Sequence, residues 1–146
     1  MTKVAFLGMG VMGYPMAGHL AAAGHDVTVY NRTESKAAQW PREHLGSARP
    51  TPREAAAGQR IVFACVGNDD DLRAVCLGED GAFAGMDPGA LFVDHTTVSP
   101  TVTGELAAAA QAAGLRYVDA PISGGQAGAG AGPGRGQGPR PKLGVL

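Results

Sequence analysis

The segment VAFLGMGVMG, residues 4–13, decides the fold of this chain. Its first four residues form a continuous apolar run, which is typical of a strand covered on both faces of a parallel sheet. Glycines follow at positions 8, 10 and 13 in the order G-x-G-x-x-G, and a helical pattern begins at Val11. A glycine-rich turn between a strand and a helix is the fingerprint of dinucleotide-binding domains, so this stretch predicts a Rossmann fold.

The three glycines of this motif have separate expected roles. Gly8 permits the tight turn, Gly10 leaves room for a pyrophosphate, and Gly13 lets the helix pack closely on the strand. Free backbone N–H groups and the helix dipole then attract phosphates, although glycines that serve only a turn remain the alternative. We expect the whole hexapeptide to contact the cofactor, that is Gly8, Met9, Gly10, Val11, Met12 and Gly13.

The rest of the chain alternates between strands and helices. Apolar runs predict strands at 27–30, 61–66, 91–94 and 117–119, and helical patterns lie at 11–23, 34–40, 52–57, 69–77 and 100–113. Pro41 is expected to stop the second helix, and Asn68 or Asp69 to cap the fourth. This alternation predicts an α/β fold with a Rossmann-type, doubly wound parallel sheet, which binds ligands at the carboxyl edge of its strands.

The composition is typical of a globular protein. The chain has 146 residues, a formal net charge of -1 and 45% hydrophobic residues, which suits one globular domain. The N-terminus resembles neither a signal peptide nor a membrane span, and Cys65 and Cys76 have neither disulfide-framework nor zinc spacing. We expect a cytoplasmic protein with no metal, no nucleic-acid partner and no membrane contact.

The composition changes after Gly125. Residues 126–146 are mostly Gly, Pro, Ala, Arg and Gln, and such a segment buries too little to offset the entropy cost of ordering. Arg135, Arg140 and Lys142 are its basic residues, too few for strong binding to nucleic acid. We expect a dinucleotide-binding domain at 1–125 and a disordered tail at 126–146.

The second predicted strand ends in Asn31-Arg32-Thr33, about twenty residues after the glycine motif. An NAD-binding domain usually has Asp or Glu there, which accepts a hydrogen bond from the ribose 2′-hydroxyl and would repel a 2′-phosphate. A guanidinium can hold a phosphate through two hydrogen bonds, and Asn31 and Thr33 can add neutral donors. We therefore expect NADP rather than NAD, unless Arg32 only stacks on the adenine or is solvated.

Further loops follow strands and should reach the same edge. In the loop after residue 66, we expect Asp69 to cap a helix and Asp70 to be solvated, because three consecutive carboxylates cannot all point at a pyrophosphate. The loop 94–99 offers the hydroxyls of Thr96 and Thr97 to a nicotinamide or a carboxylate, and His95 is a less favoured general base. Ser123, Gly124 and Gly125 offer a hydroxyl and N–H groups that suit a carboxylate, with a plain turn as the alternative.

Residues 6–20, FLGMGVMGYPMAGHL, resemble the N-terminal signature of the β-hydroxyacid dehydrogenases, and residues 119–125, DAPISGG, resemble their substrate-binding motif. That family includes 3-hydroxyisobutyrate dehydrogenase, tartronate semialdehyde reductase and succinic-semialdehyde or glyoxylate reductases. The resemblance covers residues 1 to about 128 and extends to features of the NADP-using members at 31–33, Trp40, Pro50 and 94–97. The signature usually has Leu in place of Met9, and the motif more often has Val in place of Ile122.

The resemblance implies hydride transfer between NADP(H) and a small 3-hydroxyacid or semialdehyde. It implies that Ser123, Gly124 and Gly125 hold the substrate carboxylate. Beyond the hexapeptide, it implies these cofactor contacts: Asn31, Arg32, Thr33, Val66, Gly67, Asp71, and one or both of Thr96 and Thr97.

Family members continue with a long helix that carries the catalytic lysine and with an all-helical domain, and neither is recognisable in this sequence. Lys142 lacks the family's surrounding motif, so no catalytic residue is assigned. We expect a truncated or frameshifted dehydrogenase whose exposed interdomain face favours self-association. The alternative is a catalytically inactive NADP-binding fragment or binding module.

Overall fold

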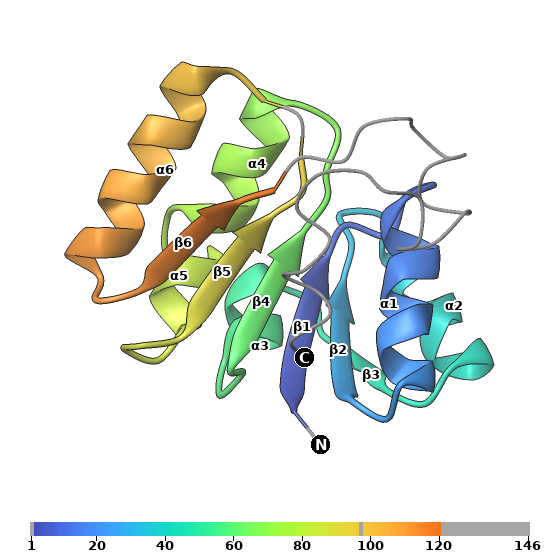
Figure 1. Cartoon of the computed structure of the whole chain (residues 1–146). Coiled ribbons are helices and arrows are strands. Elements are labelled where there is room, and N and C mark those ends of the chain that lie inside the picture. The colour runs from blue at the N-terminus through green and yellow to red at the C-terminus, as the bar shows by residue number, and fades with distance from the viewer. Residues whose placement is uncertain (1, 97, 121–146) are drawn as a thin grey trace.

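A computed structural model describes residues 2–96 and 98–120, and it shows a single sheet covered by helices (Figure 1). The strands are β1 (Lys3–Leu7), β2 (Asp26–Tyr30), β3 (Ser47–Ala48), β4 (Ile61–Ala64), β5 (Leu91–Asp94) and β6 (Arg116–Asp119). Their order in the sheet is β3-β2-β1-β4-β5-β6, and all neighbours pair in parallel. This order reverses between β1 and β4, which confirms the Rossmann-type doubly wound fold.

Helices cover both faces of the sheet (Figure 1). The helices are α1 (Gly13–Ala22), α2 (Glu34–Glu43), α3 (Pro52–Ala56), α4 (Asp69–Cys76), α5 (Ala82–Gly85) and α6 (Pro100–Ala112). One core cluster contains residues of α1 and α2, and the other contains residues of α3 to α6. Among the described residues, the sheet therefore lies between two layers of helices, and ligands of such open α/β sheets bind at the carboxyl ends of the strands.

Strand β1 shows why the sequence dictates a two-sided core. Val4 and Phe6 belong to the cluster beneath α1 and α2, whereas Ala5 and Leu7 belong to the cluster beneath the other helices. All four side chains are fully buried. Burial of a large apolar side chain contributes about 1.5–3 kcal/mol, so an uninterrupted apolar run is stable only where both faces are covered.

Helix α2 runs through Pro41 to Glu43, so the predicted stop at Pro41 is wrong. Proline removes one backbone donor, but the helix is held by Trp40, whose side chain is fully buried. The His44 N–H donates to the Trp40 carbonyl at 3.0 Å and closes the last turn. The short elements β3 and α5 are additions that the sequence pattern does not predict.

Side chains cap the N-termini of the described helices α3, α4 and α6. Asn68 caps α4, because its side-chain oxygen accepts the Asp71 N–H at 2.8 Å. The expectation that Asp69 caps this helix is wrong, since its carboxylate accepts the Ser99 N–H at 3.1 Å and joins α4 to the loop after β5.

No helix among the described residues is both long and apolar enough to cross a membrane. The predictions for the tail at 126–146, and for Lys142 within it, lie outside the described residues.

Candidate functional site

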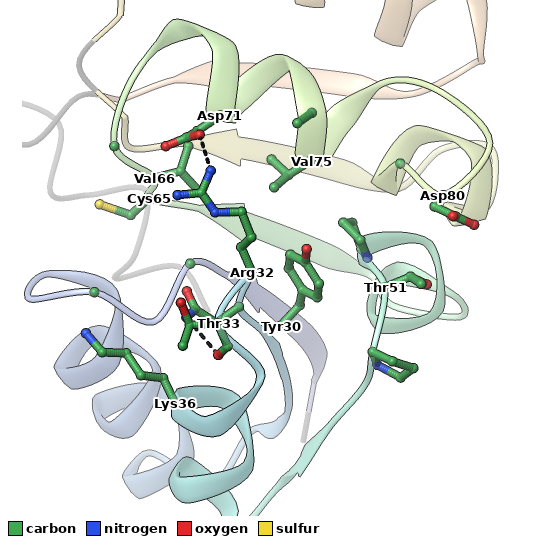
Figure 2. Close-up of a pocket in the computed structure, with 18 of the residues that line it drawn as sticks. Tyr30, Arg32, Thr33, Lys36, Thr51, Cys65, Val66, Asp71, Val75 and Asp80 are labelled. Atoms are coloured by element: carbon green, nitrogen blue, oxygen red, sulfur yellow. Dashed lines mark hydrogen bonds and ion pairs between the residues drawn. The ribbon is translucent and has the colours of Figure 1, made fainter.

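The loops that follow β1, β2 and β4 surround a cavity of about 580 Å³ at the carboxyl edge of the sheet (Figure 2). The cavity lies where the strand order reverses, which is the usual ligand position in open α/β sheets. Most of the cofactor contacts expected from the sequence line it, namely Gly8, Gly10, Val11, Met12, Asn31, Arg32, Thr33, Val66, Gly67 and Asp71.

The glycine motif has the geometry that its spacing predicts. Gly8 has a φ of +104°, and a Cβ there would collide with the Cys65 carbonyl. A Cβ on Gly13 would collide with the Gly8 carbonyl, whereas a Cβ on Gly10 would meet nothing within 4 Å. The first and third glycines are therefore required by packing, and the second borders open space in the cavity.

The N-terminus of α1 has unused hydrogen-bonding capacity. Within the part of the chain that the structure describes, no side chain caps this helix. Among the described residues, the backbone N–H groups of Gly10, Val11 and Met12 have no hydrogen-bond acceptor. Such N–H groups and the positive end of the helix dipole attract anions, so this turn fits a phosphate group.

Asn31 ties the β1 and β2 loops together. Its side-chain oxygen accepts the Met9 N–H at 2.9 Å, and its Nδ2 donates to the Thr33 carbonyl at 3.1 Å. The Asn31 amide therefore holds the shape of the cavity wall rather than standing free as a phosphate donor. The Met9 side chain is buried in the core and does not line the cavity, and Gly13 lies behind the same wall.

Arg32 leaves the end of β2 and reaches across the cavity toward α4 (Figure 2). Its side chain is 83% exposed, and its Nη1 donates to Asp71 Oδ1 at 3.0 Å. Lys36 lines the same cavity from the first turn of α2. The sequence interpretation missed Lys36, although a second basic residue four positions after Arg32 was a usable charge signal.

The three consecutive aspartates have three different partners. Asp69 accepts the Ser99 N–H, Asp71 pairs with Arg32, and Asp70 pairs with Arg73 at 3.2 Å. The Asp70 side chain is 93% exposed, as its expected solvation requires. Within residues 2–96 and 98–120, no group of three metal-ligating side chains gathers.

A second wall of the cavity comes from residues that the sequence interpretation did not assign to the site. They come from the end of β2, the first turn of α2, the start of α3 with the loop before it, the residue after β4, and α4 with its following loop. Several of them are apolar. Apart from Lys36, no local pattern marks them, and those from the α3 and α4 segments reach the cavity because these helices pack against the sheet. These additional lining residues are Tyr30, Lys36, Pro50, Thr51, Pro52, Cys65, Ala74, Val75, Leu77, Asp80 and Gly81.

Thr96, one of the two threonines expected near the cofactor, is not among the residues that line the cavity. Its side chain is buried, and its hydroxyl oxygen accepts the Val66 N–H at 3.0 Å. Thr96 therefore fixes the β4 loop from behind. The predictions for Thr97, Ser123, Gly124 and Gly125 lie outside the described residues.

His95 is packed in the interior and is not a lining residue of the cavity. Its ring stacks on Phe63 with centroids 5.9 Å apart, and its Nδ1 lies 2.7 Å from the Ala120 carbonyl oxygen. Burial lowers the pKa of His95 and favours its neutral form. The contacts show His95 joining the ends of β5 and β6, which gives no support to the general-base alternative.

Asp94, the neighbour of His95, is also buried. Its carboxylate accepts the Tyr117 hydroxyl at 2.7 Å and the Thr96 N–H at 2.8 Å. Burial raises the pKa of Asp94, and these two hydrogen bonds oppose that rise. Asp94 therefore stabilises the strand ends beside the cavity.

Most of the chain matches the model of a known family. The model of the NAD binding domain of 6-phosphogluconate dehydrogenase matches residues 3–135. The chain belongs to this family. An NAD-binding domain of this type places its cofactor against the same loops that line the cavity.

Similar proteins include oxidoreductases that are longer than this chain. An uncharacterized oxidoreductase of Shewanella frigidimarina is 60% identical over 129 residues, which are 88% of this chain and 44% of that protein. The structure of Mycobacterium tuberculosis 3-hydroxyisobutyrate dehydrogenase with L-serine is 33% identical, with a TM-score of 0.81, over 90% of this chain and 44% of that one. This NAD-binding domain therefore spans less than half the length of these relatives.

A further solved relative was captured with a cofactor. Psf3, in complex with NADP+ and 2-OPP, is 30% identical and has a TM-score of 0.80, over 88% of this chain and 45% of that one. The similarity to β-hydroxyacid dehydrogenases that the sequence motifs indicate is confirmed by the structure of the 3-hydroxyisobutyrate dehydrogenase.

Proposed function

We propose that this NAD-binding domain binds NADP in the cavity at the ends of β1, β2 and β4. The observation that carries the proposal is the pairing of an uncapped α1 N-terminus with Arg32 and Lys36 on the same cavity wall. The N–H groups of Gly10, Val11 and Met12 would hold the pyrophosphate. Asn31-Arg32 follow β2 without an acidic residue, and the Psf3 structure holds NADP+.

Cofactor choice follows from charge at the end of β2. Arg32, Thr33 and Lys36 would hold the 2′-phosphate, and Asn31 would keep the two loops in register. A charge-assisted hydrogen bond contributes about 1.5–3 kcal/mol, or about ten- to a hundredfold in affinity. Val66, Gly67 and Asp71 complete the wall on the β4 side, and Thr96 supports it.

The reaction proposed for the protein is the one that the β-hydroxyacid dehydrogenases perform. Bound NADP(H) would exchange a hydride with a small 3-hydroxyacid or its semialdehyde. Thr97, Ser123, Gly124 and Gly125 keep their proposed roles beside the nicotinamide and the substrate carboxylate. We also propose that the domain comprises residues 1–125 and that the protein is cytoplasmic. We further propose that it self-associates through an apolar face.

Calorimetric titration of the purified chain with NADPH, and separately with NADH, tests the cofactor assignment. The proposal expects NADPH to bind tighter by about tenfold or more. Equal or tighter binding of NADH would contradict the choice of NADP, and binding of neither would contradict the cofactor site.

Turnover distinguishes the dehydrogenase from the alternative of a binding module. Oxidation of NADPH is followed by absorbance after addition of tartronate semialdehyde, whose reduction gives a small acid with a 3-hydroxyl group. A dehydrogenase consumes NADPH in step with the aldehyde. A binding module shows the same affinity for NADPH without consuming it.

A further inference from the structure

The guanidinium proposed to hold the 2′-phosphate already has an anionic partner. Arg32 Nη1 donates to Asp71 Oδ1 at 3.0 Å, although 39 positions separate the two residues. Both residues line the cavity, one from the end of β2 and one from the first turn of α4 (Figure 2). The ion pair therefore lies within the proposed site rather than elsewhere on the surface.

The Asp71 carboxylate is the better shielded member of the pair. Its side chain is 27% exposed, against 83% for Arg32. Its backbone N–H is fixed by the Asn68 cap at 2.8 Å, and a Cβ added to Gly67 would lie 3.0 Å from Asp71 Oδ2. The absence of a side chain at Gly67 thus leaves the space in which the carboxylate lies.

This arrangement opposes a 2′-phosphate in two ways. The phosphate must share or displace the Asp71 carboxylate to bind Arg32, and it brings negative charge close to that carboxylate. A 2′-hydroxyl carries no charge, so NAD can bind while the Arg32–Asp71 pair stays intact. The free-energy cost of disturbing the Arg32–Asp71 pair therefore applies to NADP and not to NAD.

We propose that Asp71 is a specificity-determining residue that limits the preference for NADP over NAD by competing with the 2′-phosphate for Arg32. The inference rests on the proposed function, and it revises the role of Asp71 from a cofactor contact to a counterion of Arg32. A partly exposed ion pair contributes about 0.2–1 kcal/mol. We therefore expect Asp71 to reduce the preference for NADP by about 1.4- to fivefold.

The test compares Asp71→Asn with a matched control, Asp70→Asn. Both variants remove one carboxylate from the first turn of α4. Asp70, however, pairs with Arg73 and does not line the cavity. Dissociation constants for NADPH and NADH are measured for the wild type and both variants at the same ionic strength. Asp71→Asn should raise the NADPH-to-NADH affinity ratio by about 1.4- to fivefold, and Asp70→Asn should leave it unchanged.

A second comparison isolates the competition for Arg32. In an Arg32→Gln background, Asp71→Asn should lose most of its effect on the affinity ratio. An equal gain with and without Arg32 would overturn the competition. Equal NADPH-to-NADH affinity ratios for Asp71→Asn and Asp70→Asn would also overturn the competition. Failure of the wild type to bind either cofactor would overturn the proposed function itself, and with it the role of Asp71.

Discussion

Arg32 carries the charge that the proposed choice of cofactor depends on. Replacing it in Arg32→Gln removes the positive charge and the fork of donors from the cavity wall. NADPH affinity should fall by about ten- to a hundredfold, while NADH affinity changes by less than about threefold. Titration of both cofactors measures this change.

The matched control for Arg32→Gln is Arg42→Gln. It removes the same charge from the last turn of α2, away from the cavity-lining residues. An equal loss of affinity in both variants would mean that Arg32 acts only through the net charge of the chain.

Because His95 is buried, we expect the folding stability of the protein to depend on pH. Burial lowers the pKa of His95 in the folded state, so between that value and the unfolded value near 6.5 the unfolded chain binds more protons. The contribution of neutral His95 to the free energy of unfolding is therefore fully present above about pH 6.5. It is lost as the pH falls from about 6.5 toward the lower pKa of the folded state.

Thermal unfolding of the wild type and of His95→Asn at about pH 7.5 and about pH 5.5 checks this sign. Asn retains a donor for the Ala120 carbonyl but does not titrate. The wild type should lose more stability on acidification than the variant, by at most about 1.4 kcal/mol per pH unit. Identical losses in the two proteins would show that His95 does not titrate between the two states.

At the scale of single elements, the strand–turn–helix unit from β1 to α1 contains one glycine that packing requires and another that borders the proposed cofactor site. Gly13→Ala should destabilise the fold by about 1–3 kcal/mol or more, because the added methyl collides with the Gly8 carbonyl. Gly10→Ala should unfold at nearly the wild-type temperature, since its methyl meets nothing within 4 Å.

The same two variants differ in their expected effect on the cofactor. Gly10→Ala should weaken NADPH binding by about tenfold or more, because its methyl occupies the space proposed for the pyrophosphate. Calorimetry supplies the affinity, and thermal melts supply the stability. If Gly10→Ala binds NADPH like the wild type, the pyrophosphate does not approach this turn.

The elements differ in how well the sequence predicts them. The strand at 4–7 and the Gly8 turn follow from an apolar run and glycine spacing, because local sterics and burial determine them. The strand Ser47–Ala48 has only two residues and arises from edge pairing with Thr28 and Val29. Pro41 is tolerated in α2 because the buried Trp40 holds the last turn, a tertiary effect that the local pattern does not contain.

At the scale of the whole molecule, the sheet order assembles the site. Loops that start at positions 8, 31 and 65 meet because β2, β1 and β4 are neighbours in the sheet. Fold class and motif residues are predictable from the sequence, since a parallel sheet brings its strand ends to one edge. The Arg32–Asp71 pair and the wall from α4 depend on side-chain packing between distant segments, so the sequence pattern alone does not predict them.

The location of cofactor binding is the central claim, and amide chemical-shift mapping of the ¹⁵N-labelled chain with NADPH tests it most directly. The largest shifts are expected at Gly10, Val11 and Met12 and in the loops after β2 and β4, with weaker shifts at Arg32 and Thr33 when NADH replaces NADPH. Saturable NADPH binding whose shifts lie away from these three loops would contradict the account.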